Sequence, residues 1–363
     1  MNNTIYTDSF SKNQTQILKG VAILCIMLHN LFHWINPMNC MENEFSFNSN
    51  NIYAFFSNIV NSPLEFINIA FSYLGHYGVE IFIFLSGYGL AKSFTKTPAS
   101  WGNFIVHRLK KIYPLLLISF IYFFFTRISL YYALPTRAEF TSMLYKLLFI
   151  HTFIPGEGMS LDGPWWFFGL IVQLYIFFPL LYKYIEKHGF NAFLTVSLIS
   201  YATIYASLYA FNMPKDVYLM QNAIGHFPEF CLGILLASKK GLTVNIWCFI
   251  LALAAFILGN FYLSVYPLTF ISITYIVIFI AIVLIKNRFK LKYIKKISLI
   301  FGKYSMVLFA THGLFRWQFV VLAGNYNNAL VTLGLAIAFI FEALLLAIPA
   351  MKFYELMTTK KSI

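Results

Sequence analysis

The residues with the greatest capacity for chemistry are ionisable side chains inside strongly apolar segments. His29 and His33 lie one helical turn apart in an apolar stretch that follows Lys19. At about 1.5 Å per residue, His29 lies about 15 Å along a helix from Lys19, and the two imidazoles share a face. Imidazoles held this way suit general acid–base or nucleophilic catalysis. A lone buried His usually only satisfies a neighbouring carbonyl group, so the catalytic interpretation depends on further ionisable residues nearby.

Later apolar segments carry such residues. A carboxylate beside His29 would orient the ring and stabilise its protonated form, and we expect Glu80 or another carboxylate in this role. His312 and Arg316 share one helix face, and Glu342 is the nearest counter-charge in the sequence. Each such group at membrane depth costs a few kcal/mol unless it lines a cavity or finds a partner. The ionisable residues expected at this depth are His29, His33, Glu80, Arg127, Glu229, His312, Arg316 and Glu342.

Basic residues beside two apolar segments favour the binding of an anion. Arg108 and Lys111 share a helix face in the sequence HRLKKIYP, and with Lys19 they would form a cationic mouth suited to phosphate groups. The alternative is ordinary basic flanking of a membrane helix. The residues expected to line a cavity or an acceptor site are His33, Ser86, Arg127, Trp166, Gln173, Tyr175, His312, Arg316 and Glu342.

The elements that must position these residues are membrane helices. Of the 363 residues, 60% are hydrophobic and only 11% are charged, which exceeds what a soluble domain needs to fill a core. Because about 20 apolar residues cross a bilayer, the sequence predicts an all-α, polytopic membrane protein of about ten transmembrane helices. The predicted spans are 17–35, 76–91, 112–130, 164–182, 191–211, 223–238, 245–262, 268–285, 304–322 and 329–350.

The distribution of Lys and Arg predicts the orientation of these spans. With the N-terminus in the cytoplasm, all but five of the 26 basic residues fall on the cytoplasmic side, as membrane proteins require. An even number of spans then places both termini in the cytoplasm. The five residues left for the outer half are Arg127, Arg137, Lys146, Lys215 and Arg316.

We expect residues 1–363 to form a single membrane domain with no appended soluble domain. Segments 36–75 and 131–163 are interpreted as amphipathic or re-entrant segments of the outer face, with plain loops as the alternative. The net charge of +13 indicates topology, and no nucleic-acid partner is expected. The four cysteines lack metal-ligand spacing, so no metal site is expected.

Four motifs in order resemble the acyltransferase-3 family of bacterial integral-membrane O-acyltransferases. The first is a basic residue followed ten positions later by His, and the others are GVE-x-F-(x)3-SG, R-x-x-K-IYP and WF-(x)7-Y-(x)3-P. Segments 227–237 and 302–312 also resemble later stretches of the family, so the resemblance covers almost the whole chain. The matching residues are Lys19, Gly20, Ala22, His29, Gly78, Val79, Glu80, Phe82, Ser86, Gly87, Arg108, Lys111, Ile112, Tyr113, Pro114, Trp166, Phe167, Tyr175 and Pro179.

The resemblance implies a multi-pass enzyme of the bacterial cytoplasmic membrane. Such an enzyme takes an acyl group, usually acetyl, from cytoplasmic acyl-coenzyme A and delivers it to a carbohydrate hydroxyl on the outer side. It implies His29 as the catalytic residue, Lys19, Arg108 and Lys111 near the coenzyme A phosphates, and acetyl-coenzyme A as co-substrate with no tightly bound cofactor. Lys replaces the commoner Arg at positions 19 and 111, which keeps the charge but loses bidentate phosphate geometry.

Several alternatives stay open at this stage. A transporter or flippase of lipid-linked sugars would also contain buried charges among many spans. A succinyl or longer-chain acyltransferase would share the same architecture. His29 acts either as a general base or through an acyl-His intermediate. Because no hydrolase-like domain follows the last span, a second transfer step is expected to need a separate extracytoplasmic transferase.

Overall fold

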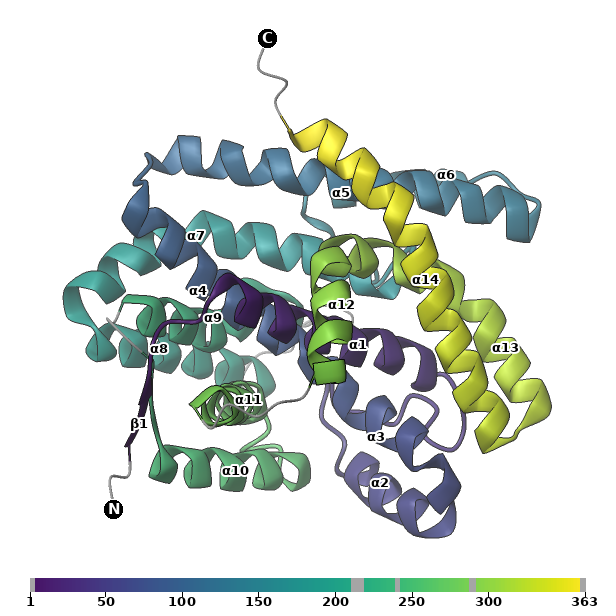
Figure 1. Cartoon of the computed structure of the whole chain (residues 1–363), viewed down its shortest axis with the longest axis horizontal. Coiled ribbons are helices and arrows are strands. Elements are labelled where there is room, and N and C mark those ends of the chain that lie inside the picture. The colour runs from purple at the N-terminus through teal and green to yellow at the C-terminus, as the bar shows by residue number, and fades with distance from the viewer. Residues whose placement is uncertain (1–3, 210–218, 239–241, 287–291, 360–363) are drawn as a thin grey trace.

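In the computed structural model, which describes residues 4–209, 219–238, 242–286 and 292–359, the chain is a bundle of helices with one small β-ribbon (Figure 1). Within these residues, eight helical segments are long and apolar enough to cross a membrane, and two shorter apolar helices accompany them. Each predicted span overlaps one of these ten segments, which confirms the all-α polytopic prediction. Lys215 and the last two residues of predicted span 191–211 lie outside the described residues.

The membrane bundle consists of eleven labelled helices in the described part of the chain. They are α1 (Lys12–Phe32), α4 (Gly78–Lys96), α5 (Trp101–Tyr131), α7 (Trp166–His188), α8 (Phe190–Tyr209), α9 (Ala223–Ser238), α10 (Ile246–Phe261), α11 (Leu268–Lys286), α12 (Lys292–Thr311), α13 (Arg316–Tyr326) and α14 (Ala329–Thr358).

The ends and outer faces of these helices follow from the local sequence. The α1 helix begins at a capping box, in which the Ser11 hydroxyl accepts from the Gln14 amide and the Gln14 side chain accepts from the Ser11 amide. On α14, Ile337, Phe341 and Leu345 recur every fourth residue and are exposed. A stripe of large apolar side chains on one helix face is what contact with lipid requires.

Two pairs of helices pack at very short range because glycines line their contacts. A Cβ on Gly233 of α9 would overlap the Phe84 carbonyl oxygen of α4, and a Cβ on Gly87 of α4 would overlap the Phe230 carbonyl oxygen of α9. Gly20 and Gly302 bring α1 and α12 together in the same way. Small residues let helices approach closely in lipid, so these contacts fix α1, α4, α9 and α12 as the centre of the bundle.

The two polar segments that were predicted to lie on the outer face contain short helices. The segment after α1 contains α2 (Ser49–Asn61) and α3 (Phe66–Leu74), which continues through a 3-10 turn (Gly75–Tyr77) into α4. The segment after α5 contains α6 (Arg137–Leu147) and a second 3-10 turn, His151–Phe153.

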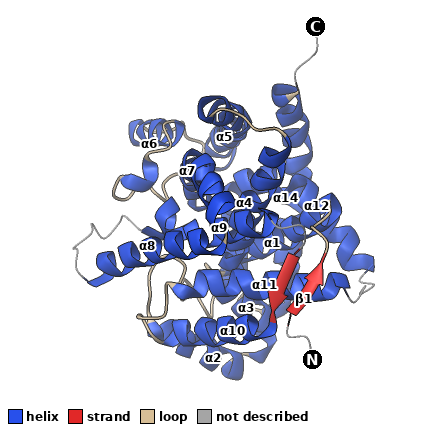
Figure 2. Ribbon diagram, turned by 90° about the vertical axis from the view of Figure 1, so that its left-hand side faces the viewer, coloured by secondary structure: helices blue, strands red, loops and turns tan. Residues whose placement is uncertain are grey.

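At another edge of the bundle, β1 (Thr4–Thr7) pairs antiparallel with β2 (Leu242–Asn245), as Figure 2 shows. The sequence patterns predicted neither of these strands.

Two predicted spans differ from the observed helices in ways that matter for the site. The third helix begins at Trp101 and not near residue 112, so Arg108 and Lys111 lie within α5 and do not precede it. The predicted span 304–322 is interrupted, because α12 ends at Thr311 and a 3-10 turn, His312–Phe315, leads into α13. The spacing predicted that His312 and Arg316 share a face of one continuous α-helix. That prediction is wrong, because the 3-10 turn separates them from such a helix.

Candidate active site

A small pocket among α1, the loop after it and the start of α7 contains the imidazole of His29. The lining also includes Glu44, His76 and Trp166. His29 is buried on α1, whereas Glu44 comes from the outer loop that follows this helix. The ring of Phe45 packs edge-on against Trp166 at 5.2 Å between ring centres, and this contact holds the loop against the pocket.

The contacts of His29 determine which ring nitrogen carries hydrogen. Nδ1 lies 3.0 Å from the carbonyl oxygen of Ser72, which can only accept a hydrogen bond, so Nδ1 donates. In the neutral ring, Nε2 then keeps its lone pair. Glu44 Oε2 lies 3.7 Å from this Nε2. The ring is thus arranged to take a proton at Nε2 beside a carboxylate that stabilises the resulting imidazolium.

Two further histidines surround His29. The His33 ring is centred 5.1 Å away, and its Nδ1 lies 3.2 Å from Glu42 Oε1. Burial by itself raises the pKa of Glu42, but the hydrogen bond and charge of His33 outweigh burial, so the pKa lies below its ordinary value. His76 is buried with its ring 5.3 Å from that of His29, and neither of its ring nitrogens has a hydrogen-bond partner among the described residues. The pocket therefore offers polar atoms that are free to contact a substrate.

A second pocket of about 140 Å³ lies on the side of the bundle nearer Lys19, and Ser86, Tyr175 and Ser305 contribute polar groups to its largely apolar lining. Arg108 lies beside this pocket, with its guanidinium over the ring of Tyr175 at 5.8 Å. Lys111 is exposed one helical turn further along α5. Of the three predicted cationic residues, Lys19 therefore lines this pocket and Arg108 contacts its lining, while Lys111 lies on the same helix as Arg108.

The two pockets meet at Phe309 of α12, which lines both. Its ring packs against Phe167 at 4.8 Å and against Phe82 at 6.2 Å. One aromatic side chain thus belongs to the walls of both pockets.

Four predicted site residues have partners elsewhere. Glu80 contacts His226, so Glu44 and not Glu80 accompanies His29. Arg127 pairs with Glu139, and Glu342 accepts from Gln318. The Gln173 side chain joins three segments by bonding Thr152, Asn222 and the amide of Ala223, which makes it an interhelical node and not part of the cavity lining.

The counter-charge of Arg316 is Asp162, which corrects the expectation of Glu342. The Arg316 Nη1 atom lies 3.1 Å from Asp162 Oδ1. Burial raises the pKa of Asp162 to about 6, although Arg316 opposes the shift. His312, four residues before Arg316, is buried, and its Nδ1 bonds the Leu308 carbonyl. In α6, burial lowers the pKa of Lys146 to about 7.

Several of these functional candidates were absent from the sequence prediction. Glu42, Glu44 and Asp162 belong to outer loops, and His76 lies in the turn before α4. One signal was available for Glu42 and Glu44: they lie in the loop that directly follows His29 and His33. Their pairing with His33 and His29 depends on how that loop folds back, and helical periodicity carries no information about this.

A bundle of helices long and apolar enough to cross a membrane, with a buried, carboxylate-paired His in a pocket, defines an integral membrane protein with a candidate catalytic centre. The chain belongs to the acyltransferase-3 family: the family model described as an acyltransferase domain matches residues 14–351. It is therefore a membrane acyltransferase. No curated protein and no solved structure matches the chain.

Proposed function

We propose that this protein transfers an acetyl group from cytoplasmic acetyl-coenzyme A to a hydroxyl of a carbohydrate on the outer side of the bacterial cytoplasmic membrane. The observation that carries the proposal is the pair of pockets that share Phe309, one lined by Lys19 with Arg108 against its Tyr175 and the other around His29. Membership of the acyltransferase-3 family favours this activity over transport of lipid-linked sugars.

The donor would bind with its anionic head at Lys19, Arg108 and Lys111 and its pantetheine arm directed inward. Coenzyme A phosphates carry several negative charges, and charge-assisted hydrogen bonds to them are stronger than neutral ones. The largely apolar lining of the inner pocket, which includes Leu85, Ile112 and Phe168, suits the uncharged arm. The thioester would then reach the pocket of His29 past Phe309.

In the transfer step, Nε2 of His29 accepts the proton of the carbohydrate hydroxyl while its oxygen attacks the thioester carbonyl. The new C–O ester bond forms, the C–S bond breaks, and the thiolate of coenzyme A takes the proton from the imidazolium. Ser72 keeps the ring in the reactive tautomer, and Glu44 stabilises its charged form. The same geometry also suits direct attack by Nε2 on the thioester, with the acetyl group passing through His29 to the hydroxyl.

Binding of acetyl-coenzyme A to the detergent-purified protein tests the proposed donor and its cationic site. Calorimetry should show binding that weakens at least roughly tenfold in Arg108→Ala/Lys111→Ala, because each lost bond to a charged group is worth about 1.5–3 kcal/mol. Lys295→Ala/Lys296→Ala is a matched control, since it removes two exposed charges from α12. Absence of binding to folded wild-type protein, or equal weakening in both double variants, would contradict the proposal.

A further inference from the structure

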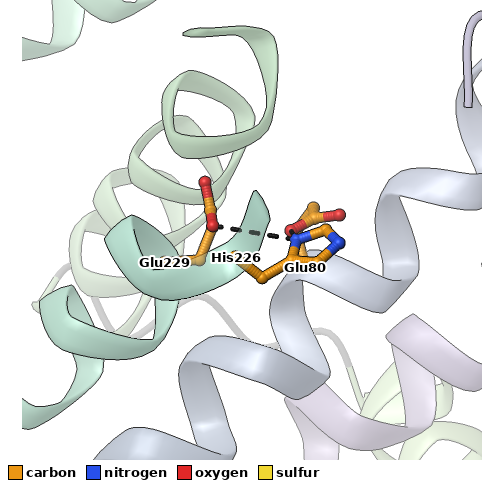
Figure 3. Close-up of side chains that lie close together, drawn as sticks. All are labelled: Glu80, His226 and Glu229. Atoms are coloured by element: carbon orange, nitrogen blue, oxygen red, sulfur yellow. Dashed lines mark ion pairs between the residues drawn. The ribbon is translucent and has the colours of Figure 1, made fainter. Parts of the chain in front are cut away.

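Three buried titratable side chains meet between α4 and α9, apart from the pocket of His29 (Figure 3). His226 Nδ1 lies 3.3 Å from Glu80 Oε2 and 3.8 Å from Glu229 Oε2. One ligand atom from each residue lies within 4.8 Å of the others. The close approach of the helices at Gly87 and Gly233 brings the three side chains together.

The orientation of His226 turns an electron pair toward both carboxylates. Nε2 lies 2.7 Å from the carbonyl oxygen of Met220, and because a carbonyl only accepts, Nε2 carries the hydrogen. Nδ1 of the neutral ring is then an acceptor that faces two further acceptors. Because three electron-rich atoms that face one another repel, the arrangement is favourable only if a positive charge lies among them.

The described surroundings supply no such charge from another side chain. Glu80 Oε2, His226 Nδ1 and both carboxylate oxygens of Glu229 lack hydrogen-bond partners among the described residues. The described neighbours of the His226 ring include Trp166, stacked at 6.1 Å, and Phe270, edge-on at 6.0 Å. In an apolar environment of this kind, unpartnered charged groups are very costly.

We propose that Glu80, His226 and Glu229 bind a divalent first-row metal ion, with Zn²⁺ as the best match. One imidazole nitrogen and two carboxylate oxygens are ordinary zinc ligands, and two carboxylates neutralise the ion. The bond from Nε2 to the Met220 carbonyl is the outer contact that orients a metal-ligating His.

The spacing of the ligand atoms fits this ion. Metal–ligand distances of about 2.0–2.2 Å in a tetrahedron place ligand atoms roughly 3.3–3.6 Å apart. The separation of His226 Nδ1 from Glu80 Oε2 already has this value, and that from Glu229 Oε2 exceeds it by a few tenths of an ångström. The three ligand atoms lie within 4.8 Å of one another, so the two carboxylates would draw together around the ion. Water would take the fourth position.

The ion would join α4 to α9 directly behind a wall of the outer pocket. Trp166 lines that pocket and stacks on the imidazole of His226. By fixing this imidazole, the metal would also hold Trp166 in place. We therefore assign the ion a structural role, in which it stabilises the helix pair and positions Trp166.

Metal content tests the proposal directly. The full chain, purified in detergent with an affinity tag that lacks histidine, is stripped with a chelator, reloaded with Zn²⁺, washed and analysed by mass spectrometry for zinc. We expect one zinc ion per wild-type chain, loss of zinc in Glu80→Gln and Glu229→Gln, and full retention in Glu342→Gln, whose carboxylate binds Gln318 instead. A wild-type protein without zinc, or equal zinc in all three variants, would overturn the assignment.

Thermal unfolding and cobalt spectroscopy distinguish a bound metal from a bound proton. Zinc should raise the melting temperature of the stripped wild type but not that of Glu229→Gln. Co²⁺ added to stripped wild type should give the visible absorption of a four-coordinate site, a measurement that needs no variant. If the cluster holds only a proton, zinc leaves the melting temperature unchanged and Glu229→Gln, which removes a buried charge, stabilises the protein; that result would refute the metal site.

Discussion

Substitution of Glu44 by Gln tests the claim that this carboxylate stabilises protonated His29. Two opposite charges about 4 Å apart interact with about 4 kcal/mol at an effective dielectric constant of about 20. Glu44 Oε2 lies 3.7 Å from His29 Nε2, and its side chain keeps 17% exposure. Because solvent screens the pair and only part of the charge has developed in the transition state, we expect a loss of about 2 kcal/mol, or roughly 30-fold in kcat.

The assay is acetyl transfer from labelled acetyl-coenzyme A in membrane vesicles that contain the protein, with release of free coenzyme A as a second readout. Glu44→Gln should lower kcat and leave donor binding unchanged, because Glu44 lies in the outer pocket, away from the cationic residues. Glu355→Gln, at an exposed position on α14, is the matched control. A wild-type kcat in Glu44→Gln would refute the role of this carboxylate.

Two other predictions concern buried charges at the outer loops. Arg316→Met leaves Asp162 buried without its cation. Because the pKa of Asp162 is already about 6 beside Arg316, uptake of a proton limits the loss of stability in detergent at pH 7 to about 1.4 kcal/mol. The difference from wild type should shrink toward pH 5, where Asp162 is protonated in both proteins, and an unchanged melting temperature at pH 7 would argue against this pair. Burial lowers the pKa of Lys146 to about 7 from 10.5. At pH values between these two, Lys146 is protonated in the unfolded chain but mostly neutral in the folded one. The stability of the fold should therefore rise as the pH increases from about 7 to 10. Lys146→Met should flatten that rise, which thermal melts at several pH values would detect.

Most of the fold could be predicted from the sequence, because apolar runs and basic flanks directly express the physics of a bilayer. All ten predicted spans lie on helical segments of the described chain. The break at His312 was not predictable, since the apolar pattern continues through the 3-10 turn that joins α12 to α13. The start of α5 was missed because the basic residues around Arg108 were interpreted as flanks, although they form part of the helix.

The candidate site was predictable only as far as single helices specify it. The spacing of Lys19 and His29 is a property of α1 alone, with His33 as the residue that caps its C-terminal end, and the structure keeps it. The partners of these residues depend on tertiary packing: the outer loop brings Glu44 to His29, while the glycine contacts between α4 and α9 direct Glu80 to His226. The sequence alone does not say which side chains pair, so it could not show that Glu44 rather than Glu80 lies beside His29.

The most direct test of the central claim is acetyl transfer by His29→Gln in a preparation that still binds acetyl-coenzyme A. His188→Gln, which changes an exposed His at the end of α7, serves as the control. We predict that His29→Gln binds the donor like wild type and loses transfer by a factor of about 10²–10⁴, the usual contribution of a general base. Transfer at the wild-type rate by His29→Gln would contradict it.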